Sequence, residues 1–128
     1  MVQPTAMESP RSLVVKLTAG TEEAERCNQA IMVAATAVTA GVPVSLWLTG
    51  EATWLAIPGR AAEFDLPHAV PMVELLDTVL SAGQVTVCTQ CAERRGIKVG
   101  QVIAGVRIAG SAAYVEEIMR PGAQAIVY

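Results

Sequence analysis

The sequence is poor in aromatic and charged side chains. Of its 128 residues only 4% are aromatic and 16% are charged, whereas 52% are hydrophobic. A core with so few aromatic rings must be built from closely packed Ala, Val, Ile, Leu and Met, a composition that suits helices packed on a parallel sheet. The mean hydropathy of +0.43 is high for a soluble monomer, because too few charges are present to cover the whole surface. We therefore expect an oligomer with apolar contacts between its subunits.

Long apolar runs and basic clusters are also absent. A membrane-spanning helix needs about 18 or more consecutive apolar residues, and Thr, Gly, Pro or a charge interrupts every apolar stretch well before that length. The net charge is −3, with only two lysines, so no face is expected to make the cationic contacts on which nucleic-acid binding depends. Residues 1–11 have neither a basic start nor an apolar segment, and they predict a flexible tail rather than a secretory signal. We expect a soluble, cytoplasmic protein without a membrane span.

Strand-like and helix-like segments alternate along the rest of the chain. The strand-like runs are 12–17, 42–49, 84–88 and 123–128, with a shorter apolar segment at 106–108, and the helix-like segments are 23–40, 52–57, 71–82, 92–95, 100–103 and 111–119. No hairpin dipeptide such as Asn-Gly joins two strands, so each strand returns through a helix, which implies a mostly parallel sheet covered on both faces. We predict one α/β domain over residues 12–128, a three-layer α/β/α sandwich with about five strands. The last helix is expected to start with Ser111 as its cap and to expose Glu116 and Glu117.

Two cysteines lie where a buried strand is expected to pass into a helix. Cys88 and Cys91 follow the apolar stretch Val85–Val87 and enclose Thr-Gln. A helix start offers unpaired backbone N–H groups and the positive end of the helix dipole, both of which stabilise a thiolate relative to a thiol. A thiolate attacks sulfur, whereas a thiol does so poorly. We therefore predict that Cys88 and Cys91 carry the chemistry of this protein.

Three charged residues are candidates to assist these thiols. If the helix begins at residue 89 or 90, Cys91 lies in its first turn, and Arg94 and Arg95 follow three and four residues later, close enough to place positive charge near a thiolate. Glu51 follows the second predicted strand. Because the carboxyl ends of parallel strands meet at one edge, where ligands bind, Glu51 is expected near the thiols. The alternative for all three is an ordinary solvated charge.

Other readings of the cysteines carry less support. A zinc site needs four ligands, and Cys27 and His68, the only other Cys or His residues, are spaced unlike any zinc finger or ribbon. A thioredoxin-type enzyme places its CxxC after the first strand of its core, with an aromatic residue or Pro beside it, whereas this pair follows a later strand. No metal or cofactor is expected. Cys27 is expected to fill the core and His68 to lie in a loop, and the simplest alternative for Cys88 and Cys91 is burial as small apolar residues.

The order of these features resembles the DsrE/DsrF-like family of small sulfur-relay proteins. The resemblance is carried by the turn 18–20, the Ala-rich first helix ending at Gly41, the strand 44–49 with Gly50-Glu51, the run Val87-Cys88-x-x-Cys91 with Arg95-Gly96-Ile97, the pair Gly105-Val106, and the closing strand 125–128.

The resemblance implies a three-layer α/β/α fold, assembly into trimers or hexamers, and a cysteine that accepts sulfur as a persulfide and passes it to a partner protein. In the family the sulfur-carrying cysteine lies at the strand end before the Arg-Gly-Ile segment, a region that Cys88 or Cys91 matches. The leading hypothesis is a cytoplasmic sulfur carrier or sulfurtransferase with a donor or acceptor protein as partner. The alternatives are a non-enzymatic oligomeric binding subunit with structural cysteines and a CxxC thiol-disulfide reductase.

Overall fold

The computed structural model describes residues 11–128, which form a five-stranded sheet in which all strands are parallel. The strands lie in the order β4-β3-β2-β1-β5. Their bounds are β1 Ser12–Leu17, β2 Val44–Leu48, β3 Gln84–Cys88, β4 Arg107–Ala109 and β5 Ala123–Val127. The predicted α/β sandwich with about five strands is confirmed. The tail predicted at residues 1–11 lies, apart from Arg11, outside the described residues.

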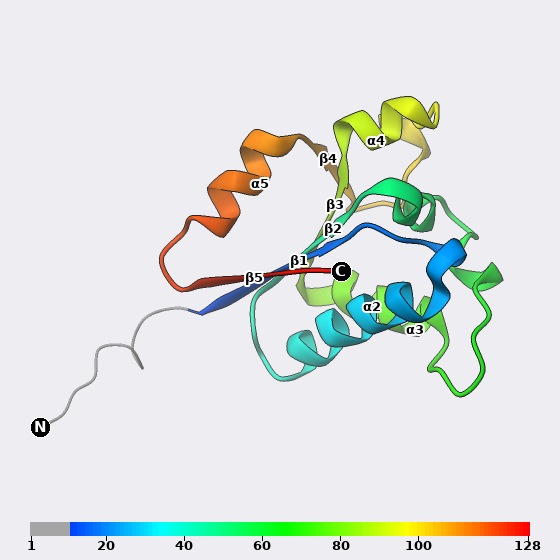
Figure 1. Ribbon diagram of the computed structural model, residues 1–128, viewed down its shortest axis with the longest axis horizontal. Helices are drawn as coiled ribbons and strands as arrows, with labels where there is room; N and C mark the ends of the chain where they lie inside the picture. Colours follow the sequence, from blue (N-terminus) through cyan, green and yellow to red (C-terminus); the bar gives the residue numbers. More distant parts are fainter. Residues whose placement is uncertain (1–10) are drawn as a thin grey trace, which may run out of the picture.

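Helices cover both faces of this sheet. They are α2 Ala24–Thr39, α3 Met72–Ala82, α4 Thr89–Arg94 and α5 Ser111–Ile118, with short 3₁₀ segments η1 Thr21–Glu23, η2 Gly50–Ala56, η3 Ala61–Glu63 and η4 Val99–Gln101. Figure 1 shows α2 and α3 on one face and α5 on the other. Right-handed crossovers explain this arrangement, because the chain steps in one direction from β1 to β4 and then returns across the whole sheet to β5. In the part of the chain that the structure describes, no helix is both long and apolar enough to span a membrane.

The hydrophobic core lies between the sheet and the pair α2 and α3. Alternate strand residues point into it and have no exposed surface, among them Val15, Leu17, Leu46 and Val87. Cys27 on α2 is also fully buried there, as predicted. With so few aromatic rings available, close packing of aliphatic side chains supplies most of the stability of this layer.

The opposite face of the sheet carries a row of polar and aromatic residues. Lys16, Trp47, Thr86 and Arg107 are register partners on four adjacent strands. Arg107 Nε donates to Thr86 Oγ1 at 3.0 Å, and the Arg107 guanidinium lies 5.4 Å from the centre of the Trp47 ring. The Tyr114 ring of α5 meets Trp47 edge-on at 5.3 Å and lies 5.0 Å from Lys16 Nζ. This row is the surface on which α5 packs.

Glu117 fixes α5 to that face, so the prediction that it is exposed is wrong. Only 4% of its surface is accessible, and its carboxylate accepts hydrogen bonds from Ser45 Oγ at 2.6 Å, from Trp47 Nε1 at 2.9 Å and from the Arg107 guanidinium. Burial raises the pKa of Glu117, but these hydrogen bonds and the charge of Arg107 outweigh it, and the pKa lies below its ordinary value of 4.5. Glu116, the neighbouring residue, is exposed as predicted.

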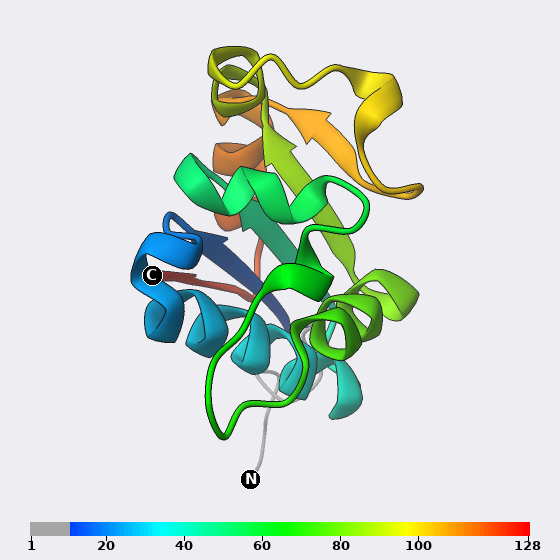
Figure 2. The same cartoon turned by 90° about the vertical axis from the view of Figure 1, so that its right-hand side faces the viewer.

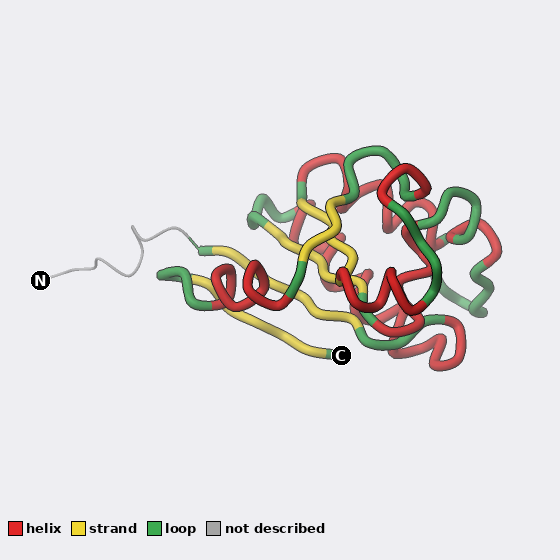
Figure 3. Tube along the Cα trace, turned by 90° about the horizontal axis from the view of Figure 1, so that it is seen from above, coloured by secondary structure: helices red, strands yellow, loops and turns green. Residues whose placement is uncertain are grey.

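β5 forms one edge of the sheet and pairs only with β1 within residues 11–128. Figure 3 shows it as the outermost strand, with the C-terminus at its end. Its sequence, Ala-Gln-Ala-Ile-Val, holds no charge or proline, the residues that commonly protect an edge strand. Val127 is 61% exposed, and Met119 at the end of the adjacent α5 is 75% exposed.

The start of α4 and the cap of α5 differ from the local sequence pattern. α4 begins at Thr89, three residues before the segment 92–95, which agrees with the start at residue 89 or 90 considered for the thiols, and Cys88 takes the N-cap position with an extended backbone. α5 begins at Ser111 as predicted, but its N-cap is Gly110 and not Ser111. The start of α4 matters for function, because it places both cysteines on one helical turn.

Candidate functional site

The carboxyl ends of β3 and β4 lie side by side in the sheet. These neighbouring strands are in register at Cys88 and Ala109, after which the chain turns into α4 and α5. Ligands bind outside the carboxyl ends of parallel strands, most often where adjacent connections leave toward opposite faces. Here α5 covers the face opposite to α2 and α3 (Figure 1). Cys88 therefore occupies a position that the topology itself favours for binding or chemistry.

Cys88 is the more accessible thiol of the pair. It ends β3, caps α4 and is partly exposed. Burial of its sulfur raises its pKa, but hydrogen bonds from the Cys91 amide and thiol and from the Gln90 amide, together with the charge of Lys16, outweigh burial and bring the pKa of Cys88 below its ordinary value of 9.0. A larger fraction of this thiol is therefore ionised at neutral pH than of an ordinary cysteine.

Cys91 lies on the inner side of α4 and is only 8% exposed. The Gly50 N–H, at the end of β2, donates to Cys91 Sγ at 3.3 Å. Cys91 is the third residue of α4, and Cys88 is the N-cap of the same helix. The structure thus brings together the two cysteines that the sequence singles out, with one at the surface and the other behind it.

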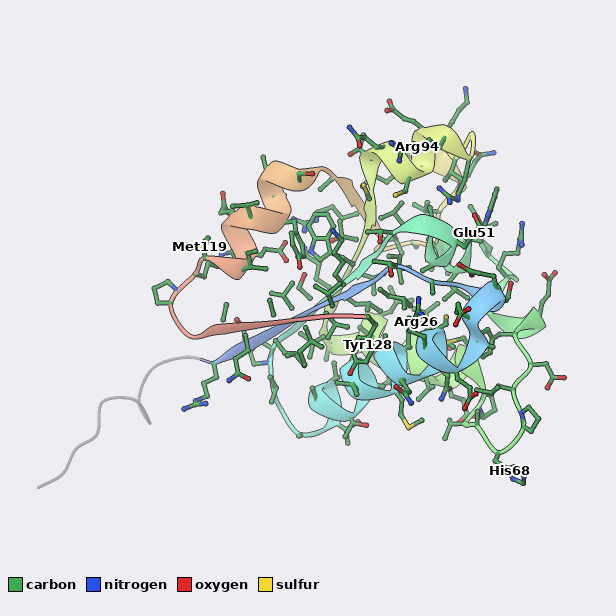
Figure 4. The ribbon with its side chains drawn as sticks, viewed as in Figure 1. Arg26, Glu51, His68, Arg94, Met119 and Tyr128 are labelled. Atoms are coloured by element: carbon green, nitrogen blue, oxygen red, sulfur yellow. The ribbon has the colours of Figure 1, made fainter. Side chains whose placement is uncertain are left out.

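Arg95 and Glu51 tie α4 to the segment after β2. Arg95 Nε and a terminal nitrogen donate to Glu51 Oε2 at 3.0 and 2.8 Å, and the other terminal nitrogen donates to the Cys91 carbonyl at 3.1 Å. Figure 2 shows η2, which carries Glu51, between α4 and α2. Arg94 is exposed, and Figure 4 shows it on α4 at the same end of the molecule as Glu51. Glu51 and Arg95 thus lie beside Cys91, whereas assistance from Arg94 stays a prediction.

Lys16 is a site residue that the sequence analysis missed. It lies in the same row of the sheet as Thr86, which is two residues before Cys88 on β3, so Lys16 and Cys88 share one face of the sheet. The positive charge of Lys16 contributes to lowering the pKa of Cys88. The signal was present, because Lys16 interrupts an otherwise apolar strand, Ser-Leu-Val-Val-Lys-Leu. What the sequence alone does not give is the register that places Lys16 on the same face of the sheet as Cys88.

Cys27 and His68 take no part in this arrangement. Burial raises the pKa of Cys27 to about 12, and the negative charge of Glu22 contributes. His68 is exposed in the connection before α3, and Figure 4 shows it at the far tip of the molecule from Arg94. Among residues 11–128, no three His, Cys, Asp or Glu side chains gather as metal ligands.

Two glycines hold the ends of β1 and β2 together beside Cys91. A Cβ on Gly50 would lie 2.6 Å from the Thr18 carbonyl oxygen, and one on Gly20 would lie 2.6 Å from the Glu51 carbonyl oxygen. Gly50 also has a φ of +55°, a conformation that side chains other than glycine rarely adopt. The Gly50 N–H donates a hydrogen bond to Cys91 Sγ, so the close approach of the segments that follow β1 and β2 also positions this thiol.

Replacing Gly50 by alanine is expected to lower the free energy of unfolding by about 2 to about 3 kcal/mol, from the left-handed backbone and the steric clash together. Gly41 has a φ of +86° but open space around it, so Gly41→Ala is a control that should cost only about 1 kcal/mol. Gly20→Ala tests the clash without the left-handed backbone. Urea unfolding measures all three variants. Equal losses for Gly41→Ala and Gly50→Ala contradict the close approach of the strand ends.

Comparisons with known proteins agree with this fold. The model of the DsrE/DsrF-like family matches residues 12–127. No curated protein matches the chain. Among solved structures, the YchN protein from E. coli has a TM-score of 0.67 at 15% identity, with 94% of this chain and 100% of that chain covered.

Two further structures have the same fold. MTH1491 from Methanobacterium thermoautotrophicum, described as a protein of unknown function, has a TM-score of 0.61 at 9% identity and covers 94% of this chain and 100% of its own. BT1422 from Bacteroides thetaiotaomicron, a conserved protein of unknown function, has a TM-score of 0.56 at 14% identity, with 98% and 100% covered. At such identities these structures show the fold alone. Because the family model spans nearly the whole described chain, the protein belongs to the DsrE/DsrF-like family.

Proposed function

We propose that the protein is a sulfur carrier in which Cys88 accepts sulfane sulfur as a persulfide and passes it to a partner protein. The observation that carries the proposal is the state of Cys88, a partly exposed thiol at a strand end whose hydrogen bonds and neighbouring Lys16 favour the thiolate. Membership of a family of sulfur-relay proteins supports the same reading. Cys91 is the weaker candidate for the carrier because it is nearly inaccessible.

The transfer needs no metal and no redox cofactor. The Cys88 thiolate attacks the terminal sulfur of a donor persulfide, a new S–S bond forms on Cys88, and the donor's own sulfur leaves as a thiolate with the electron pair of the broken bond. The reverse exchange with an acceptor thiolate unloads the carrier. In this scheme Arg95 and Glu51 hold the thiol-bearing turn in place, and exposed Arg94 is available to an anionic donor or acceptor. The relay requires a reducing compartment such as the cytoplasm, because oxidation would join Cys88 to Cys91.

Mass spectrometry after treatment with inorganic polysulfide tests this proposal. We expect Cys88 to gain one sulfur atom, Cys88→Ser to gain none at residue 88 or 91, and Cys27→Ser, the matched control at a buried thiol, to behave as the wild type. The proposal fails if Cys88→Ser still transfers sulfur to an acceptor thiol at the wild-type rate, or if Cys88 gains no sulfur in either the wild type or Cys91→Ser.

We further propose that copies of the chain associate, as trimers or hexamers, through the apolar surface formed by α5 and β5. This surface combines an edge of β5 that no strand of residues 11–128 covers with the exposed side chains of Val115, Met119 and Val127. Exposed apolar groups of this kind mark contact sites, and a sheet edge without charges pairs readily with another chain. The same surface supports the alternative in which the protein is mainly a binding subunit.

Val127→Lys is expected to reduce the mass of the particle measured by light scattering, because the charge would be buried without a partner at the interface. Val99→Lys is the matched control, since Val99 is also exposed but lies on η4. A wild type that is already monomeric, or one whose mass Val127→Lys leaves unchanged, contradicts this surface as the interface.

A further inference from the structure

The two thiols of the site differ in access although they are neighbours. Cys88 is partly exposed, whereas Cys91 is 8% exposed and lies behind it, with its sulfur held by the Gly50 N–H at 3.3 Å. A bulky donor or acceptor can therefore reach Cys88 and not Cys91. The sulfur nearest to Cys91 along the chain is that of Cys88, the N-cap of the helix whose first turn holds Cys91.

We infer that Cys91 is a resolving thiol, which expels the sulfur stored on Cys88 as hydrosulfide and closes a Cys88–Cys91 disulfide. The inference rests on the proposed persulfide on Cys88 and adds an outcome to it: sulfide release when no acceptor arrives. The carrier would then hold its sulfur for a limited time rather than indefinitely.

The step balances without an outside reagent. The Cys91 thiol gives its proton to water, and its sulfur attacks Cys88 Sγ. The new Cys91–Cys88 bond forms as the bond between Cys88 Sγ and the outer sulfur breaks, and the outer sulfur takes that electron pair and leaves as HS⁻. The two cysteine sulfurs are oxidised to a disulfide, and the sulfane sulfur is reduced to sulfide. An external dithiol is needed only to reduce the disulfide before the next round.

The backbone allows this closure with little movement. Cys88 caps α4 and Cys91 is its third residue, and positions three apart on a helix have Cα atoms about 5 Å apart. Disulfides join Cα atoms separated by about 4.4 to about 6.8 Å. The backbone of Cys88 is held by the pairing of β3 with β4, in which its partner is Ala109. The backbone of Cys91 is held by the hydrogen bond that the Arg95 guanidinium donates to the Cys91 carbonyl. These contacts hold the backbone of both cysteines in place.

No other thiol of the chain can take this role. Cys27 lies in the core between α2 and the sheet, on the face opposite to Lys16 and Trp47, with its pKa raised to about 12. Cys27→Ser is therefore a matched control that removes a thiol without touching the pair.

The test follows sulfur on the whole protein through time. Wild type, Cys91→Ser and Cys27→Ser are loaded briefly with inorganic polysulfide and freed of excess reagent. Intact mass, released sulfide and the Cys88–Cys91 disulfide peptide are then measured. We expect wild type and Cys27→Ser to lose the added sulfur, releasing about one sulfide per chain with formation of the disulfide, and Cys91→Ser to retain its persulfide at least about tenfold longer, because an intramolecular thiol acts at high effective concentration.

Each result decides a different claim. Equal loss of sulfur from wild type and Cys91→Ser, or loss without the disulfide, overturns the resolving role and leaves the persulfide carrier standing. Absence of any added sulfur on Cys88 in all three proteins overturns the carrier and the resolving role together. Cys91→Ala repeats the comparison without a buried hydroxyl, and circular dichroism establishes that each variant is folded.

Discussion

Glu117→Ala is expected to lower the free energy of unfolding by about 3 to about 5 kcal/mol, a large share of the stability of a domain of this size. The carboxylate accepts hydrogen bonds from Ser45, Trp47 and Arg107, and without it Trp47 would be a buried donor, and Ser45 and Arg107 half-buried donors, that have lost this acceptor. A buried ion pair contributes little beyond its own desolvation cost, but removing one partner leaves the other charge unpaired, which is strongly destabilising. Urea unfolding at neutral pH measures the loss.

Glu116→Ala is the matched control for this change. Glu116 is on the same helix, and its ion pair with Arg120 is exposed on both sides, so its removal should cost about 0.5 kcal/mol or less. A similar loss for the two variants contradicts the buried network. Glu117→Gln, which keeps the shape and an acceptor oxygen, should fall between them.

The same carboxylate makes stability depend on pH. Because the pKa of Glu117 is lower in the folded protein than its ordinary 4.5, the folded state binds this proton more weakly than the unfolded state. Its contribution is therefore complete above pH 4.5 and is lost as pH falls through the lower, folded-state pKa. Unfolding curves of the wild type should steepen in their pH dependence below 4.5, and Glu117→Gln should lack that component.

The sheet and its helices could be predicted from the sequence because local pattern and global fold agree. The runs 12–17 and 84–88 are strands with the predicted bounds, and α3 begins one residue after its predicted proline. In these segments the burial of apolar side chains and the turn residues at each end favour the same structure. The absence of hairpin turns likewise predicted the parallel order.

The polar face under α5 could not be predicted, because it depends on register between distant segments. A glutamate near the end of an amphipathic helix is usually solvated, and only Trp47 and Arg107, which come from two other strands, make burial of Glu117 favourable. The role of Lys16 could not be predicted for the same reason.

The candidate site was easier to predict from the sequence. Cys88, Cys91, Arg95 and Glu51 all follow the carboxyl ends of predicted strands, and in a parallel sheet these ends lie at the same edge. The sequence did not distinguish the roles of Cys88 and Cys91, because their difference in exposure depends on how α4 packs against β3 and η2.

Alkylation at pH 7 is expected to modify Cys88 more than about 1000-fold faster than Cys27 in the native protein. The thiolate is the reacting form, and the pKa of Cys27, raised from 9.0 to about 12, alone reduces its thiolate about 1000-fold, while the pKa of Cys88 is below 9.0. Iodoacetamide labelling followed by tryptic digestion gives the rates, since Cys27 falls in peptide 27–60 and Cys88 in peptide 61–94, where fragment ions separate it from Cys91. Comparable rates for the two thiols contradict the ionised state of Cys88.

The variant Lys16→Met tests what ionises Cys88. Lys16 stands on the same face of the sheet as Cys88, and its charge favours the thiolate, so its loss should raise the pKa of Cys88 and slow labelling at pH 7 roughly threefold. Lys98→Met changes the net charge equally, but Lys98 is exposed beside η4, so labelling should be unchanged. If both variants slow labelling equally, the overall charge of the protein is responsible. If only Lys16→Met does, the charge that adds to the hydrogen bonds of Cys91 and Gln90 in lowering the pKa of Cys88 is local, and it comes from the sheet face that α5 covers.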